Sequence, residues 1–139
     1  LLCDEGRDVA TSSISAARNE QMEGWGEIMS LYVHPQAFRK GYGAFLFSYV
    51  TEQLKQVGFE KIYLWVLEEN VNARAFYERM GFVPNGDRSM ISIGGKECVE
   101  IRYVNRESRN RCIPVVIGGG KNERSVDTAY AAGAGRRRF

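Results

Sequence analysis

One segment, VHPQAFRKGYGAFLFSYV at 33–50, limits the fold more than any other part of the sequence. It leaves an apolar strand, crosses a proline and enters a helix through two glycines preceded by Arg39 and Lys40. The residues before it, EIMSLYV (27–33), predict a strand buried on both faces, because the run is short, apolar and rich in strand formers. After the glycines, apolar residues recur at helical spacing as far as Val57, and Gly58 predicts the end of the helix.

The same order of elements occurs a second time. KIYLWVL (61–67) predicts another strand, and the helix that follows has apolar residues on one face as far as Met80 and ends at Gly81. A strand and a helix followed by another strand and helix predict an α/β fold, with a parallel strand pair joined by a right-handed crossover.

Shorter elements are expected on either side of this unit. Residues 90–104 predict a hairpin that turns at Gly94 and Gly95. Upstream, we expect strands near residues 1–9 and within 6–18, followed by a turn at 19–26 that leads into the central strand.

Length and charge divide the chain into one domain and a tail. The 139 residues are 44% hydrophobic, which suffices for one packed domain over residues 1–105. Residues 106–139 contain eight Lys and Arg against three Asp and Glu, a net +5, whereas residues 1–105 contain 11 against 14, a net −3. We expect the Gly-, Ala- and Arg-rich tail to be disordered, because it cannot bury a core.

Several classes of protein do not fit the sequence. No run of about 18 apolar residues is present, so we expect no membrane span. The start LLCDEGRDV has acidic residues where a signal peptide needs basic ones, which favours a cytoplasmic protein; it begins with Leu rather than Met. The three cysteines show no CxxC spacing, so we expect reduced thiols and no metal site.

The glycine-rich helix entry, RKGYG, has two interpretations. The unpaired N–H groups and partial positive charge of a helix N-terminus suit a pyrophosphate where side chains stand aside. Alternatively, the glycines only permit positive φ in a tight turn. The dinucleotide-binding fingerprint is excluded because Leu46 stands where its third glycine belongs, and GGGKN is not a Walker loop because Asn122 replaces Ser or Thr.

LYVHPQAFRKGYG resembles the first cofactor motif of the GNAT superfamily of acyl-CoA-dependent N-acyltransferases. An apolar strand, Pro35, Gly41 and Gly43 match this motif, whereas Phe38 occupies its Gln or Arg position, with Arg39 one place later. The resemblance implies a GNAT-like mixed sheet with splayed central parallel strands and flanking helices, and a cofactor whose phosphates are held by backbone amides. Family members usually have one strand and one or two helices before the first strand expected here, and those elements are absent.

VLEENVNARAFYERMGF (66–82) is similar to the second cofactor motif of the same family, so that the resemblance covers about residues 27–105. It implies that acetyl-CoA is the co-substrate and that the chain is an N-acetyltransferase acting on a primary amine by direct attack in a ternary complex. The cofactor-binding residues that it implies are Leu31, Tyr32, Val33, Phe38, Arg39, Lys40, Gly41, Tyr42, Gly43, Ala44, Asn70, Ala73, Phe76 and Tyr77.

Three catalytic roles follow from the resemblance. An alkylamine with a pKa of about 10.4 must lose a proton before it attacks. Glu27 is the expected base, and the alternative is a solvated carboxylate at a strand end. Backbone N–H groups at 31–33, next to a bulge, are expected to stabilise the oxyanion. Tyr77 is the expected acid for the thiolate, and the alternative is a core aromatic residue.

Other candidates have simpler explanations. His34 is expected to be a solvated loop residue. Asn70 is expected to orient the cofactor, to cap the second helix, or both. Trp25, Tyr32 and Trp65 are expected to pack in the core rather than to line an acceptor pocket. The three arginines at 136–138 indicate a solvated tail rather than a nucleic-acid site.

The partners are a small-molecule or protein amine, and a homodimer is a further possibility in which a second chain supplies the missing elements. A competing hypothesis is a non-catalytic acyl-CoA-binding module, or an inactive fragment of such an enzyme. It is motivated by the absent N-terminal elements and by Phe38.

Overall fold

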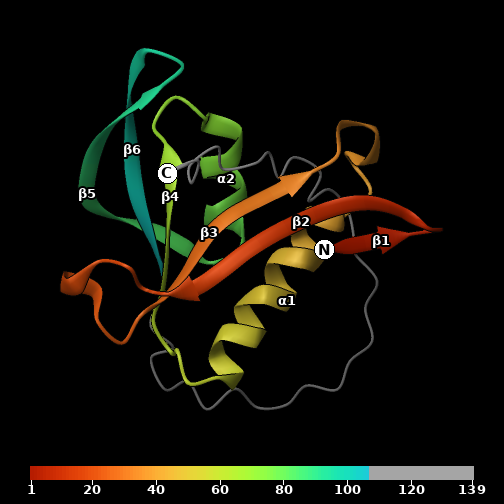
Figure 1. Ribbon diagram of the computed structural model, residues 1–139, viewed down its shortest axis with the longest axis horizontal. Coiled ribbons are helices and arrows are strands. Elements are labelled where there is room, and N and C mark those ends of the chain that lie inside the picture. The colour runs from red at the N-terminus through yellow and green to blue at the C-terminus, as the bar shows by residue number, and fades with distance from the viewer. Residues whose placement is uncertain (107–139) are drawn as a thin grey trace.

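The computed structural model of the chain describes residues 1–106, so the prediction for the tail lies outside the described residues apart from Arg106. Six strands form one mixed sheet in the order β1-β2-β3-β4-β6-β5 (Figure 1). In chain order the elements are β1 (Leu2–Asp4), β2 (Arg7–Ala16), the 3-10 turn η1 (Glu20–Met22), β3 (Gly26–Val33), the 3-10 turn η2 (Pro35–Ala37), α1 (Tyr42–Gln56), β4 (Ile62–Leu67), α2 (Val71–Arg79), β5 (Phe82–Ile93) and β6 (Lys96–Asn105).

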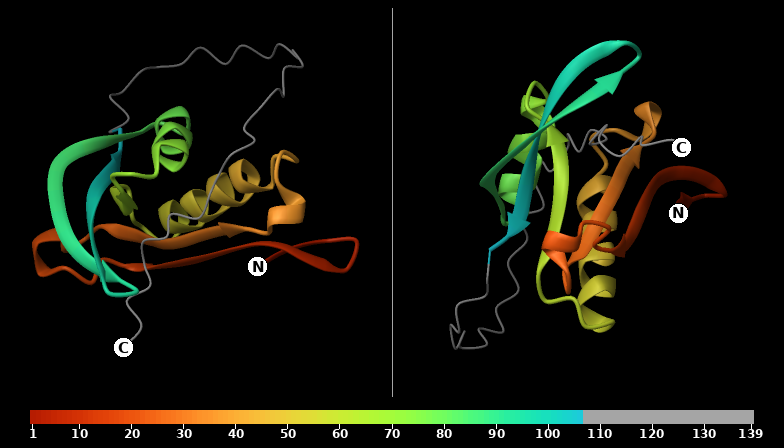
Figure 2. Two further views of the ribbon diagram at one scale, coloured as in Figure 1. Left: turned by 90° about the horizontal axis from the view of Figure 1, so that it is seen from above. Right: turned by 60° about the vertical axis from the view of Figure 1, so that its left-hand side comes forward.

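Both α-helices cover the same face of the sheet (Figure 2). The periodicity of α1 places Leu46, Phe47, Val50 and Leu54 in the core, as the spacing predicts. The ring of Phe47 lies 5.6 Å from that of Phe76 in α2, so the two helices meet over the sheet through an aromatic contact. The predicted α/β fold, a mixed sheet with flanking helices, is confirmed.

The parallel pair at the centre of the sheet is also confirmed. β3 and β4 run parallel, with α1 between them in the chain. Ile62, Leu64 and Val66 of β4 are buried in the core beneath the helices. Tyr63, on the other face, is 1% exposed, so β4 is covered on both sides, as its continuous apolar run indicates.

Both predicted N-terminal strands are present, but the first is shorter than expected. β1 ends at Asp4, and β2 (Arg7–Ala16) lies within the predicted range 6–18; the two form a hairpin in which Asp4 pairs with Arg7. The two turn residues, Glu5 and Gly6, have φ values of 48° and 76°. A turn with two positive φ values matches the twist of a hairpin, but a glutamate in the first of these positions gives no sequence signal for it.

The C-terminal hairpin is confirmed at Gly94 and Gly95, and β5 begins earlier than predicted, at Phe82. β6 lies between β4 and β5 and is antiparallel to both. The pairing of β5 with β6 is interrupted between Pro84 and Arg88, so that residues 85–87 have no partner in the ladder. Gly86, at φ 93°, lies at the centre of this interruption.

Candidate active site

The central strands separate beyond a short stretch of pairing. β3 and β4 pair only from Gly26–Ile62 to Ile28–Leu64, and Figure 1 shows them diverging beyond that point. On its other edge, β3 pairs with β2 through a register shift, since Ser13 pairs with Ser30 and Ile14 with Ile28. Met29 is therefore the extra residue of a β-bulge.

This bulge reverses which residues of β3 face the helices. Ile28 before the bulge and Leu31 and Val33 after it all lie in the core, although strict alternation would place Ile28 opposite the other two. The sequence resemblance led us to expect a bulge near residues 31–33, and the structure has it at Met29, two residues earlier.

The backbone beyond the bulge carries donors that face the gap between the strands. The N–H group of His34 donates to the carbonyl of Val9 in β2 at 2.8 Å. Because alternate residues of a strand point their backbone groups to opposite edges, the N–H groups of Leu31 and Val33 point toward β4. No pairing with β4 reaches these residues in the described part of the chain. The side chain of Tyr32 faces away from the core and is 41% exposed.

The connection from β3 to α1 ends in a helix N-terminus that lacks a side-chain cap. Gly41 is the N-cap residue, with φ 77°, and no side chain bonds to the first turn. The first backbone bond of the helix runs from the N–H of Phe45 to the carbonyl of Gly41 at 3.0 Å. The N–H groups of Tyr42, Gly43 and Ala44 come before Phe45 in the chain and have no carbonyl partner within the helix, so they can donate hydrogen bonds to an anion.

Both interpretations receive support at Gly41, whereas Gly43 lies within α1 and is not among the glycines with positive φ. Gly41 requires its positive φ, which agrees with a tight turn. A Cβ built on it would meet no atom within 4 Å, so open space lies in front of the backbone there. Arg39, at φ 63°, and Lys40 are exposed beside this opening. The arrangement is therefore a tight turn. It also leaves space for a ligand at the start of the helix, next to two positively charged side chains.

Two side chains near this turn make contacts that the sequence did not predict. Phe38, at the position of the motif's Gln or Arg, is partly buried and packs against the core instead of offering a polar group. The hydroxyl of Tyr42 donates to Asp4 at the end of β1. This hydrogen bond to Asp4, with a smaller effect of burial, raises the pKa of Tyr42. Tyr42 therefore ties the N-terminal hairpin to the first turn of α1.

The second motif lies at the start and along the buried face of α2. The side-chain oxygen of Asn70 accepts from the N–H of Ala73 at 3.1 Å, so Asn70 caps the helix, as one of its two expected roles requires. Ala73, Phe76 and Tyr77 each have no exposed surface. The ring of Tyr77 lies 5.4 Å from that of Phe47, within the aromatic core. The structure thus shows the packing role of Tyr77, and its role as an acid stays a prediction.

Glu27 lies on the opposite face of the sheet from Tyr77 and is 3% exposed. Arg18 donates to both of its oxygens, from Nε at 3.0 Å and from Nη2 at 2.7 Å, and the hydroxyl of Tyr63 donates to Oε2 at 2.9 Å. Burial opposes the charge of Glu27, but the hydrogen bonds from Arg18 and Tyr63 and the charge of Arg18 together lower the pKa of the carboxyl below its ordinary value. Glu27 is therefore ionised at neutral pH and takes up a proton less readily than a free carboxylate.

A polar cavity of about 490 Å³ opens on the Glu27 side of the sheet. It is lined by Arg18, Asn19, Gln21, Glu27, Tyr63, Trp65, Asp87, Arg88, Ser89 and Arg102. Trp65 therefore lines a pocket, contrary to our expectation of core packing alone, while Trp25 packs against the ring of Tyr63 at 6.5 Å.

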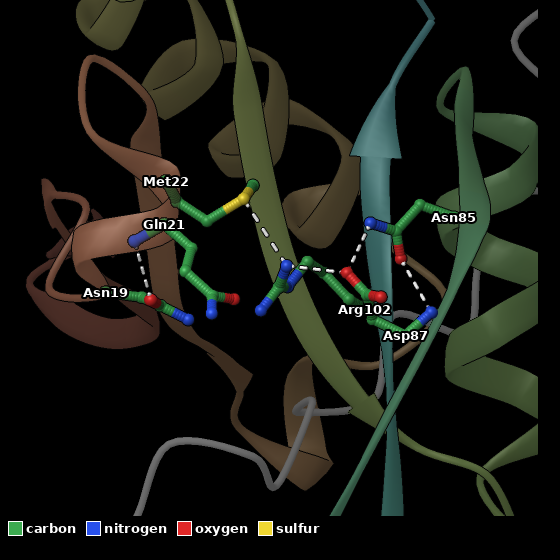
Figure 3. Close-up of polar contacts among 6 residues, drawn as sticks. All are labelled: Asn19, Gln21, Met22, Asn85, Asp87 and Arg102. Carbon is green, nitrogen blue, oxygen red and sulfur yellow. Dashed lines mark hydrogen bonds and ion pairs between the residues drawn. The ribbon is translucent and has the colours of Figure 1, made fainter.

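Arg102, the most buried cation of this cavity at 6% exposed, was not predicted from the sequence. Its Nη1 donates to Asp87 at 2.7 Å and contacts the sulfur of Met22 at 3.3 Å, so that it bridges η1 and β5 (Figure 3). Asp87 reaches this position because residues 85–87 leave the ladder. The turn-forming sequence NGD at these positions was the available signal for that interruption.

The remaining predictions concern metals, histidine and membranes. No group of three or more metal-ligating side chains occurs within residues 1–106, where Cys3 and Cys98 are both free thiols. His34 is exposed, and its Nδ1 accepts from the N–H of Gln36 at 3.2 Å. Neither helix of the described region has the length and apolar character needed to cross a bilayer.

Comparison with known proteins identifies the family. The model of the acetyltransferase (GNAT) family matches residues 2–82, and the chain belongs to this family. A mycothiol acetyltransferase from Beutenbergia cavernae is 41% identical over 59 residues, which are 42% of this chain and 20% of that protein. The chain thus spans about a fifth of the length of this curated relative.

Solved structures agree in fold. The ribosomal-protein-alanine N-acetyltransferase from Brucella melitensis is 19% identical, with a TM-score of 0.67 over 75% of this chain and 65% of its own. An acetyltransferase from Bacillus subtilis in complex with CoA is 17% identical, with a TM-score of 0.60 over 74% of this chain and 72% of its own. At these identities the likeness concerns the fold.

Proposed function

We propose that this domain transfers an acetyl group from acetyl-CoA to a primary amine by direct attack within a ternary complex. The observation that carries the proposal is the divergence of β3 from β4 beyond Ile28, together with the uncapped N-terminus of α1 that follows the connection from β3. A thioester between diverging strands has free backbone donors beside it, and a pyrophosphate at the helix start meets free N–H groups. The amine would thus meet the thioester of the bound acetyl-CoA between the diverging strands.

The residues at the start of α1 would hold the cofactor. The N–H groups of Tyr42, Gly43 and Ala44 suit the pyrophosphate, with Arg39 and Lys40 adding positive charge. Acetyl-CoA, when bound, supplies the activated acyl group.

The backbone beyond the bulge would stabilise the reaction. The N–H groups of Leu31 and Val33 would stabilise the negative charge that develops on the carbonyl oxygen, an effect on the order of 10² to 10³ in rate for one such donor. Tyr77 would give a proton to the leaving sulfur from the helical side, and Glu27 would receive the proton of the amine from the other side. The position of these two residues on opposite faces of the sheet supports a thioester held between the strands.

A second candidate function is the binding of acyl-CoA without turnover. Two observations favour it: Tyr77 has no exposed surface, and each oxygen of Glu27 already accepts a hydrogen bond. Both residues would have to change their surroundings before they could exchange protons with a substrate. The lack of a polar side chain at Phe38 is consistent with this candidate as well.

Calorimetry and a thiol-release assay separate the two candidates. We expect the protein to bind CoA and to release free thiol from acetyl-CoA in the presence of some members of a panel of primary amines. Binding of CoA without thiol release for any amine would favour the second candidate. A folded protein with no affinity for CoA would contradict both.

A further inference from the structure

The guanidinium group of Arg102 is held rigidly on the face of the sheet that carries Glu27. It lies 4.6 Å above the ring centroid of Trp65 and 5.4 Å from that of Tyr63. The contacts of Nη1 with Asp87 and Met22 fix one corner of the group. A buried cation fixed by two aromatic faces and one carboxylate loses little further freedom when it binds a ligand.

The opposite edge of this guanidinium includes a donor without a partner. Nε is buried and has no hydrogen-bond partner among residues 1–106, whereas the contacts with Asp87 and Met22 are made by Nη1. A buried donor without a partner is costly, and a ligand oxygen would remove that cost. The edge formed by Nε and Nη2 is a planar pair of donors suited to a carboxylate.

Arg18, in the same cavity, demonstrates this mode of binding. Its Nε and Nη2 donate to the two oxygens of Glu27 at 3.0 Å and 2.7 Å. Nε of Arg102, by contrast, has no hydrogen-bond partner among residues 1–106. Asn19, Gln21 and Ser89 add neutral polar groups to the lining.

The charges around the cavity leave no net positive charge. Its lining carries three positive charges, on Arg18, Arg88 and Arg102, and two negative ones, on Glu27 and Asp87, while Arg88 is also paired with Glu68 at 2.8 Å. The buried Glu100 lies nearby in β6 and adds negative charge, which further disfavours a dianion such as a phosphate monoester.

We infer that the cavity binds the carboxylate of an amine acceptor through the Nε and Nη2 edge of Arg102, so that the acceptor is a small amine that also carries a carboxylate. The inference rests on the proposed function for the acceptor role. The carboxylate site itself stands on the geometry of Arg102 and its cavity.

Binding to the unchanged protein gives the first test. In the presence of CoA, amino acids are titrated by calorimetry beside their carboxamides, their decarboxylated amines and phosphoethanolamine. We expect the carboxylate to improve affinity about 10- to 100-fold over the carboxamide, as hydrogen bonds to a charged group do. NMR should show a shift of the Arg102 Nε–H signal. Equal affinities, no binding of any member, or tighter binding of the phosphate compound would overturn the inference.

Substitution of Arg102 tests whether this residue causes the preference for the carboxylate. Arg102→Lys keeps the charge and removes the planar edge, so we expect it to abolish the preference for the carboxylate. Arg79→Gln, an exposed position on α2 outside the cavity, should retain the preference in full. A preference that survives in a folded Arg102→Lys protein would contradict the assignment. If this variant does not fold, the ligand comparison and the NMR signal of the unchanged protein decide the question.

Turnover separates the inference from the proposed function. Carboxylate-dependent binding without thiol release from acetyl-CoA would contradict the proposed function and leave the carboxylate site intact. Thiol release that is equally efficient with amino acids, carboxamides and simple amines would contradict the inference and leave the proposed function intact.

Discussion

The hydroxyl of Tyr63 in β4 donates a 2.9 Å hydrogen bond to Oε2 of Glu27 in β3. These residues are direct partners in the parallel pair, one position before the last pairing of the two strands. The hydrogen bond therefore lies where β3 and β4 begin to diverge, next to the proposed place of acyl transfer. It also fixes the position of the Glu27 carboxylate.

Replacing Glu27 by Gln should destabilise the domain. The change removes a buried charge whose hydrogen bonds satisfy Arg18 and Tyr63, and we expect a loss of about 1 to 3 kcal/mol in the free energy of unfolding. Arg18 is partly exposed and can be hydrated again, which limits the loss. Urea denaturation measures the effect, with the exposed Glu23→Gln as the matched control.

The stability difference between the unchanged protein and Glu27→Gln should depend on pH. Because the folded state lowers the pKa of Glu27, its stabilising effect is complete above the ordinary value of 4.5 and disappears as the pH falls through the lowered value. The difference in stability between the unchanged protein and Glu27→Gln should therefore shrink on acidification. A difference that grows at acidic pH would contradict the ion pair.

Tyr63 should show the opposite dependence at alkaline pH. Burial, together with the hydrogen bond to Glu27 and its charge, raises the pKa of Tyr63 from 10.0 to about 12. Its contribution is complete below pH 10 and is lost as the pH rises through about 12, a change of about 2 to 3 kcal/mol. Denaturation of the unchanged protein and of Tyr63→Phe across this window tests the expectation, and the exposed Tyr49→Phe should show no such difference.

Two glycines that flank α1 allow the effect of backbone strain to be distinguished from an effect on cofactor binding. Gly41 and Gly58 have φ values of 77° and 103°, and an added Cβ meets no atom within 4 Å at either position. Alanine at each should destabilise the fold by about 1 to 2 kcal/mol. Calorimetry with CoA should show weaker binding only for Gly41→Ala. Equal affinities for both variants would argue against a pyrophosphate at the start of α1.

Asn70 allows its two expected roles to be distinguished. Asn70→Ala removes the cap of α2 and should cost about 1 kcal/mol, whereas the exposed Asn72→Ala should cost less. Asn70→Asp retains a capping oxygen but lacks the amide donors. If Asn70 also orients the cofactor, Asn70→Asp should retain stability and lose affinity for CoA. Unchanged affinity would leave only the capping role.

Tyr77→Phe tests the proposed acid. The ring contacts within the aromatic core remain, so the thermal midpoint should change little, while kcat in the thiol-release assay should fall about 10² to 10⁴-fold. Tyr49→Phe provides the control for loss of a phenol hydroxyl. An unchanged kcat in an active preparation of Tyr77→Phe would assign Tyr77 to packing alone.

Features that depend on neighbouring residues could be predicted from the amino-acid sequence. The apolar stripe of α1, the cap at Asn70, the glycine at φ 77° and the turn at Gly94 and Gly95 all follow from side chains within a few positions of one another. Local spacing controls helix amphipathicity, capping and turn conformation, so these features could be predicted.

Tertiary structure alone decided the polar face of the sheet. The bulge at Met29 and the burial of Glu27 between Arg18 and Tyr63 depend on which strands are adjacent and in which register. The pairing of Arg102 with Asp87 depends on the interruption of the ladder at residues 85–87. Register and buried ion pairs arise from contacts between residues distant in the chain, and periodicity along one segment contains no information about them.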